Sequence, residues 1–297
     1  MKVIAQLSAL AFALVSASPS LAADSDQPLV LEPSSNWNLD YGEEDCRLGR
    51  SFGEGEDKVI LIFAKYAPGT DMEIMLTGRG LSADRARDFS YRFDPQQEVE
   101  VDRPLFGDTP DDGTIWQFSG GLLAAEDFDA DDGLETEKQK TKSLEEDIAK
   151  KVESFTVQIG RKTPITLRTG KLSGAIAAMD VCLDNLVTSW GYDTADLATI
   201  ATWPKPKGSI TSWFNYRDYP GEALRKDLSG AVRFRLAIDA TGSLTDCVIQ
   251  SSYSDPSFPE KVCSEFLRKA KFEPARNAAG EGVASYWNNT VVFLSQP

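Results

Sequence analysis

The spacing of apolar residues over the first two thirds of the chain predicts a β-rich region that ends in a helix. Five segments have strand character, because they carry β-favouring apolar residues bounded by glycine or proline, or alternate apolar with polar positions. These segments are Cys46–Phe52, 58–66, 73–77, Ser154–Ile159 and 165–168. A helix is predicted over 171–190, because apolar residues recur there every three or four positions and Gly191 supplies a stop.

The last quarter of the chain has a different order of elements. A half-buried strand is predicted where apolar positions alternate with other residues. Its apolar positions are Val232, Phe234, Leu236 and Ile238, and the positions between them are Arg233, Arg235 and Ala237. A turn over 239–242 and a second strand over 244–250 complete a hairpin. A helix and a final strand over 283–294 follow, so the order is ββαβ with one helix covering one sheet face. The apolar face of that helix contains Phe258, Val262, Cys263, Phe266, Leu267 and Ala270.

These patterns predict an α+β protein with two domains. The stretch Trp203-Pro-Lys-Pro-Lys-Gly208 separates them, because its two prolines cannot continue a helix or a central strand. We therefore predict a β-rich N-terminal domain over 23–200 that ends in a helix, a Pro/Gly linker over 201–218, and a small ββαβ domain over 219–297.

Negative charge is concentrated in the first of these domains. The chain of 297 residues contains 31 Lys+Arg and 46 Asp+Glu, which gives a formal net charge of −15. From Gly221 onward, nine basic residues balance nine acidic ones, so the excess lies upstream. A charge this negative argues against nucleic acid and anionic lipid as partners, because phosphate groups bind clustered Lys and Arg.

The chain contains no histidine, which excludes several classes of enzyme. A Ser-His-Asp triad, a Cys-His dyad, an HExxH zinc site and an imidazole proton shuttle all require one. Paired carboxylates could hydrolyse glycosides, but Asp and Glu are so numerous that no pair stands out. No GxSxG, GxGxxG or P-loop sequence occurs. We predict a non-enzymatic protein with no catalytic residue, cofactor or metal.

The first residues have the pattern of a secretory signal. Lys2 is followed by an apolar segment over 3–15, and Ser20-Leu21-Ala22 fits the small-x-small cleavage rule. We expect cleavage after Ala22. The alternative is an uncleaved membrane anchor, although the apolar segment is shorter than the roughly 20 residues that span a bilayer.

An acidic segment over 126–147 includes a sequence that invites comparison with a calcium-binding loop. An EF-hand loop needs Gly at its sixth position and a bidentate Glu at its twelfth. Counted from Asp127, these positions hold Asp132 and Lys138, so both requirements fail. A solvated acidic loop that leads into a helix near 137–151 is the prediction.

Export permits disulfide bonds, and the chain has four cysteines without a CxxC pair. Four cysteines allow three connectivities. The predicted domains favour Cys46–Cys182 and Cys247–Cys263, because each pair then joins a strand to a helix of the same domain. The alternative is that the thiols are free.

Several short motifs of the last quarter occur in a recognisable order. They are Tyr219-Pro220, Gly230-x-Val-x-Phe-x-Leu-x-Ile-Asp-x-x-Gly242, Val248 with Ser251-Ser252, and Ala270-x-Phe272-x-Pro274-Ala275. This ordered set resembles the C-terminal domain of the TonB family, over about 219–297. Motifs of the first half resemble the N-terminal part of exported alphaproteobacterial proteins that carry such a module. They are Trp37, Cys46-Arg-Leu, Phe52-Gly53, Cys182, Leu186 and Ser189-Trp-Gly191.

The resemblance implies a periplasmic protein-binding module. TonB-family domains contact outer-membrane transporters by adding a peptide strand to the sheet edge beside the last strand, in the manner of β-augmentation. In this chain, the partner-binding edge would be Tyr286, Trp287, Asn288, Asn289, Thr290, Val291, Val292 and Phe293. Odd-numbered and even-numbered residues of this set fall on opposite faces. The alternatives are that they pack against the helix or pair within a homodimer.

The chain also departs from an energy-transducing TonB protein. Such a protein has an uncleaved membrane helix with a functional histidine and a long Pro-rich spacer, and an acidic domain stands here in place of the spacer. We therefore predict a periplasmic TonB-like binding module that resembles energy transducers of transmembrane transport. Its partner would be an outer-membrane TonB-dependent transporter or another envelope protein. The alternative is an envelope interaction or inhibitor-like protein whose N-terminal domain binds the partner while the TonB-like domain dimerises.

Overall fold

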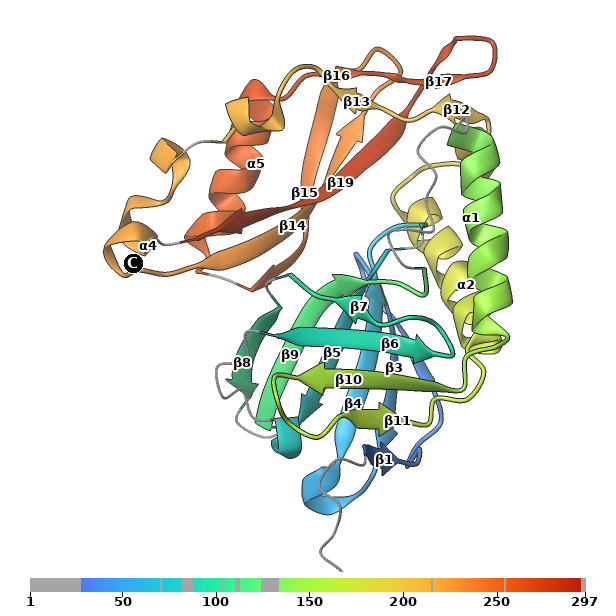
Figure 1. Ribbon diagram of the computed structural model, residues 1–297. Coiled ribbons are helices and arrows are strands. Elements are labelled where there is room, and N and C mark those ends of the chain that lie inside the picture. The colour runs from blue at the N-terminus through green and yellow to red at the C-terminus, as the bar shows by residue number, and fades with distance from the viewer. Residues whose placement is uncertain are drawn as a thin grey trace, which may run out of the picture.

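The computed structural model describes residues 28–69, 71–81, 88–102, 104–109, 113–123, 134–214, 216–253 and 255–294. Figure 1 shows an N-terminal part with two sheets and two long helices, below a C-terminal part with a three-stranded sheet and one long helix. The α+β class is therefore confirmed. The predicted signal peptide over 1–22 and the acidic sequence over 127–133 lie outside the described residues.

The first sheet of the N-terminal part has six antiparallel strands in the order β2-β3-β4-β5-β9-β8. Their bounds are Asn38–Tyr41 for β2, Cys46–Phe52 for β3, Val59–Lys65 for β4, Met72–Gly78 for β5, Leu105–Thr109 for β8 and Gly113–Gly120 for β9. Strands β3, β4 and β5 confirm three predicted segments to within one residue.

The second sheet has the order β1-β11-β10-β6-β7, with β1 parallel to β11 and the other pairs antiparallel. Its strands are β1 (Leu29–Leu31), β6 (Phe89–Asp94), β7 (Val99–Glu100), β10 (Ser154–Ile159) and β11 (Ile165–Leu167). Aromatic pairs join β6 to the first sheet, with ring centroids 5.0 Å apart for Phe89 and Trp116 and 5.1 Å apart for Tyr91 and Phe118. The two sheets thus share one core.

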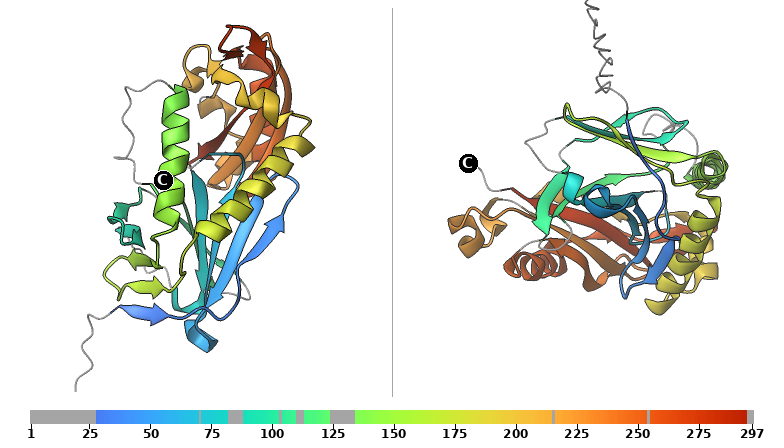
Figure 2. Two further views of the ribbon diagram at one scale, coloured as in Figure 1. Left: turned by 90° about the vertical axis from the view of Figure 1, so that its right-hand side faces the viewer. Right: turned by 90° about the horizontal axis from the view of Figure 1, so that it is seen from below.

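Two long helices pack beside these sheets, and Figure 2 shows both on one side of the molecule. They are α1 (Leu134–Ala149) and α2 (Ser173–Ser189), and a short helix, α3 (Thr194–Ala198), follows. The predicted helix over 171–190 is α2, and the disulfide Cys46–Cys182 joins it to β3 across a Cα–Cα distance of 6.1 Å. A buried ion pair between Lys65 of β4 and Glu145 of α1, with N and O 3.3 Å apart, fixes α1.

The C-terminal part contains a sheet of order β15-β14-β19 covered on one face by a helix. Its elements are β14 (Gly230–Ile238), β15 (Leu244–Tyr253), α5 (Ser257–Lys269) and β19 (Ser285–Phe293), after the short helix α4 (Gly221–Arg225). The alternation predicted for β14 is confirmed, because Val232, Phe234, Leu236 and Ile238 are all buried. Leu267 was expected on the buried face of α5, but its side chain is 55% exposed because it lies on the solvent side of the helix.

The stretch 201–218, predicted as a linker, pairs with and packs on the C-terminal part. Strand β12 (Ile200–Thr202) pairs with β17 (Ala275–Asn277), β13 (Lys205–Pro206) pairs with β16 (Phe272–Glu273), and β18 (Gly282–Val283) completes a small sheet. Short 3-10 helices occur at Gly55–Asp57, Arg79–Leu81, Ile210–Ser212 and Tyr216–Asp218. Trp213 is only 4% exposed and lies in the core under α5. The domain limits at 200 and 219 stay predictions.

Candidate functional site

The strand predicted to bind a partner, β19, lies at an edge of the C-terminal sheet. It pairs antiparallel with β14 along its whole length, from Gly230 opposite Phe293 to Ile238 opposite Ser285. Within the described ranges, β14 is the strand to which β19 pairs, so its other side faces away from the sheet. Figure 1 shows β19, in dark red, crossing the front of this part of the molecule.

The backbone of β19 directs part of its N–H and C=O groups toward that outer side. In an antiparallel pair, every second residue directs its N–H and C=O away from the partner strand. The N–H of Thr290 donates to the side-chain oxygen of Asn289 at 2.7 Å, which places Thr290 in the outward-directed set. Asn288 and Val292, two residues away on either side, share that direction. Asn289 and Val292 are exposed, so this end of the strand is accessible.

The odd-numbered side chains of β19 face α5. Trp287, Val291 and Phe293 pack against the core beneath that helix, where the rings of Phe293 and Phe258 have centroids 4.5 Å apart. These residues of the predicted partner-binding set therefore anchor the strand. Between them, Asn289 is exposed at the edge.

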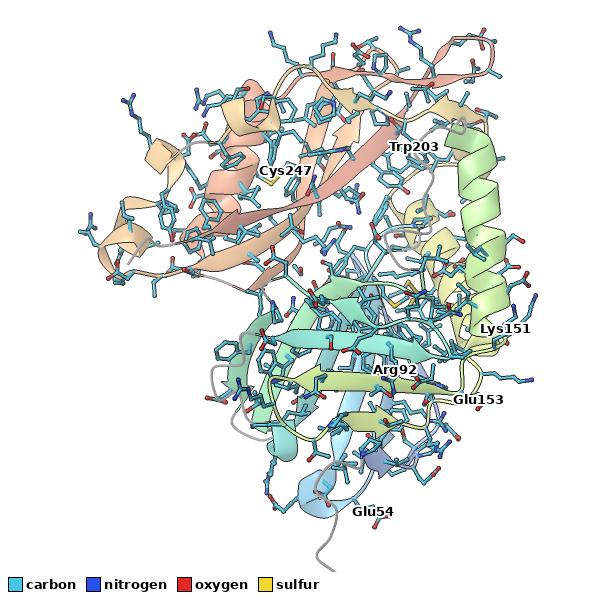
Figure 3. All side chains as sticks on the ribbon, in the orientation of Figure 1. Glu54, Arg92, Lys151, Glu153, Trp203 and Cys247 are labelled. Carbon is cyan, nitrogen blue, oxygen red and sulfur yellow. A yellow bond between two sulfur atoms is a disulfide. The ribbon has the colours of Figure 1, made fainter. Side chains whose placement is uncertain are left out.

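The opposite face of β19 is buried at its first residues. Tyr286 is 5% exposed and packs against three aromatic rings of the preceding chain, Trp190, Tyr192 and Trp203, at centroid distances of 5.3, 5.6 and 5.4 Å. The hydroxyl of Tyr192 donates to the carbonyl of Ser285 at 2.9 Å. Figure 3 shows Trp203 beside this end of β19. Burial raises the pKa of Tyr286, so its hydroxyl is neutral.

The central strand β14 is fastened to the N-terminal part through Arg235. Its side chain is 7% exposed, and its guanidinium donates to both carboxylate oxygens of Glu44, at 3.1 and 3.3 Å. The guanidinium carbon lies 4.1 Å from the ring centroid of Trp190, which adds a cation–π contact. A carboxylate and an aromatic ring thus compensate the buried positive charge.

A second arginine of β14 makes an equivalent contact. The Arg233 guanidinium carbon lies 4.5 Å from the centroid of Tyr66, and a guanidinium nitrogen is 3.7 Å from a carboxylate oxygen of Glu73. On the neighbouring strand β15, the Gln250 side-chain amide donates to the carbonyl of Tyr66 at 2.8 Å. We call the contacts of Arg233, Arg235, Gln250 and Tyr286 with the N-terminal part the domain junction.

The sequence indicated Arg233 and Arg235 only as the polar positions of a half-buried strand. Alternation of apolar and polar residues separates a core-facing side from another side. It does not say whether the other side meets water or a second domain. The partners of these arginines lie more than 40 residues away in the sequence, so no local pattern connects them.

The helix α5 is held by a disulfide and by an ionic cluster. The disulfide Cys247–Cys263 joins β15 to α5 with a Cα–Cα distance of 5.5 Å, as predicted. Glu265 is 5% exposed and pairs with Lys261, Arg268 and Lys269. Burial alone would raise the pKa of this carboxyl, but hydrogen bonds from the three cations outweigh it and lower the pKa to about 2.

The described residues contain no group of three or more His, Cys, Asp or Glu side chains that could hold a metal ion. No helix in the described part of the chain has the length and apolar character needed to cross a membrane.

Comparison with protein families identifies the C-terminal part. Residues 215–294 match the family described as Gram-negative bacterial TonB protein C-terminal. No curated protein matches the chain. The resemblance noted in the sequence is therefore confirmed for this segment. The family consists of non-enzymatic periplasmic domains, and the match implies a TonB-like envelope role for residues 215–294.

Proposed function

We propose that this protein is a periplasmic binding module that captures an extended peptide strand along the outer side of β19. The partner is an outer-membrane TonB-dependent transporter, whose periplasmic tail adds to the sheet as a fourth strand. Capture of this kind draws its affinity from backbone hydrogen bonds and its selectivity from side-chain contacts.

The accessible edge of β19 is the observation that carries this proposal. The nine-residue strand pairs on one side with β14, and its outward backbone groups at Asn288, Thr290 and Val292 lie in a segment of half-exposed and exposed side chains. A strand of this length at the edge of a sheet is a template for pairing with another chain. The match to the TonB C-terminal family supports the choice of partner.

The polar character of the edge supports strand capture over packing of an apolar surface. Asn288, Asn289 and Thr290 occupy the middle of the strand, and Val292 is 54% exposed near its end. Polar side chains in the middle of an edge strand protect it from uncontrolled aggregation while leaving its backbone available.

The test is a proline substitution at an outward-directed position. Val292→Pro removes the N–H that a partner strand would use, and the matched control Val292→Thr keeps it with a β-branched side chain. The probe is a labelled peptide copied from the periplasmic tail of an outer-membrane transporter of the source bacterium, titrated against the full mature chain. We expect binding by wild type and Val292→Thr, and at least tenfold weaker binding by Val292→Pro.

Two outcomes would contradict the proposal. One is that the wild-type chain binds none of the transporter tails of its own cell. The other is that Val292→Pro binds as tightly as Val292→Thr, which would move the contact away from β19 and favour the N-terminal part as the binding surface. Circular dichroism of both variants establishes that the fold is retained.

A further inference from the structure

The geometry points to the N-terminal part as a positioning element of the strand-binding site. We infer that the domain junction orders β19 for capture through Arg233 and Arg235, and limits the usable edge to Asn288–Val292. This inference rests on the proposed function of β19, and its test separates the two.

The register of the sheet connects the junction to the edge. Arg235 lies directly opposite Asn288, and Arg233 lies directly opposite Thr290. Directly opposite residues of an antiparallel pair project from the same face, with Cβ atoms about 4.5–5.5 Å apart. The two side chains that fasten β14 to the N-terminal part are therefore the nearest cross-strand neighbours of two outward-directed edge residues.

The junction restrains β14 at two points along its length. Glu44 and Trp190 hold Arg235, and Glu73 and Tyr66 hold Arg233. Since β14 is the central strand of three, restraint of β14 fixes the orientation of the β19 edge. A strand that is already ordered loses less conformational entropy when a partner binds, and so binds more tightly.

The junction also sets where a partner strand can lie. Tyr286 is enclosed by aromatic rings from the preceding chain, whereas Val292 is exposed. We therefore expect a bound peptide strand to stop short of Tyr286 and to pair with the segment Asn288–Val292. The two charges beneath this segment are compensated by Glu44 and Glu73, so the edge selects a strand by backbone pairing and by uncharged side chains.

The first arm of the test needs no partner. Arg235→Met removes the contact with Glu44 and the cation–π contact but keeps an apolar side chain of similar length. Arg225→Met, at an exposed position of α4, is the matched control. Amide hydrogen exchange of Asn288–Val292 is expected to be about tenfold faster in Arg235→Met than in wild type, and unchanged in Arg225→Met.

The second arm measures binding of the transporter-tail peptide by the same proteins. Arg235→Met is expected to bind about tenfold more weakly than wild type. The charge-swapped double variant Glu44→Arg, Arg235→Glu re-forms the ion pair with reversed polarity, and is expected to recover part of the lost affinity over Arg235→Glu alone.

The outcomes separate the inference from the function on which it rests. If wild type binds the peptide and Arg235→Met binds equally well with unchanged exchange at β19, the inference is wrong while strand capture stands. If exchange rises as expected but wild type binds no peptide, the junction orders β19 and the proposed function fails. Absence of rescue in the double variant would also count against the inference.

Discussion

The two faces of the C-terminal sheet are covered in different ways. The face toward α5 is apolar, and Phe234 packs on Phe266 with ring centroids 4.3 Å apart. The other face carries Arg233 and Arg235, which pair with carboxylates and aromatic rings of the N-terminal part. One sheet is therefore folded by hydrophobic burial on one side and positioned by compensated charges on the other.

The apolar contacts of the α5 face stabilise the fold of the C-terminal part, whereas the ion pairs of the other face orient it relative to the N-terminal part. Burial of apolar side chains is non-directional and contributes most of the stability of a core. Paired buried charges contribute less net stability, because desolvation offsets their attraction, but they require a particular geometry. We therefore expect changes on the α5 face to affect folding and changes on the junction face to affect orientation and binding.

The largest expected effect is on the α5 face. Phe234 is fully buried, so Phe234→Ala removes its contacts with Phe266 and Trp287 and leaves a cavity in the core. Such substitutions cost about 3–5 kcal/mol of unfolding free energy. Denaturant unfolding of wild type and variant measures this cost. A loss of unfolding free energy below about 1 kcal/mol would contradict the view that the α5 face supplies most of the stability.

A smaller effect is expected on the junction face. Arg235→Met should lower the unfolding free energy by about 1–2 kcal/mol, because Glu44 stays partly exposed and the methionine retains apolar contact with Trp190. The single variant Glu44→Gln and the double variant Arg235→Met, Glu44→Gln complete a thermodynamic cycle. The cycle gives the coupling free energy between Arg235 and Glu44. If the coupling between Arg235 and Glu44 is indistinguishable from zero, the ion pair does not hold the junction.

How far the sequence predicted this structure depends on the length of each pattern. Strands β3 and β10 and the helix α2 were predicted within two residues, because their apolar spacing repeats several times. Strands β6 and β9 were not predicted, although they have six and eight residues. Strands β12, β13 and β16 to β18 have two or three residues and no repeat to detect. The prolines near Trp203 indicated a linker, yet β13 tolerates Pro206 in a two-stranded pairing.

Some features of the candidate site were likewise predicted from the sequence, and others were not. The final strand, its two faces and its edge position followed from alternation and from the resemblance to the TonB family. The burial of Tyr286 did not, because its covering rings come from Trp190, Tyr192 and Trp203, more than 80 residues earlier. Contacts between domains depend on how the two surfaces meet, which no short sequence pattern encodes.

The smallest expected effect is the dependence of stability on pH through Glu265 of α5, on the apolar side of the C-terminal sheet. The pKa of Glu265 is lowered to about 2 in the folded protein. Its contribution to stability is therefore complete above its ordinary pKa, near 4.5, and is lost as the pH falls toward 2. We expect Glu265→Gln to reduce the loss of stability over this range by up to about 1 kcal/mol, since solvent screens the lysines and arginine of the cluster.

Thermal unfolding at several pH values from 2 to 5 measures this contribution in both proteins. Equal slopes for wild type and Glu265→Gln would show that the cluster around Glu265 does not stabilise α5. At pH 7, where Glu265 is ionised, the difference in stability between wild type and Glu265→Gln reports the loss of the ion pairs alone.

Nuclear magnetic resonance of the isotope-labelled chain with and without the transporter-tail peptide tests strand capture most directly. Addition of the peptide is predicted to slow solvent exchange at the amides of Asn288 and Val292, and to leave alternate amides already bonded to β14 unchanged. Protection that appears on β15 or on the N-terminal sheets instead, with β19 unaltered, would contradict capture at this edge.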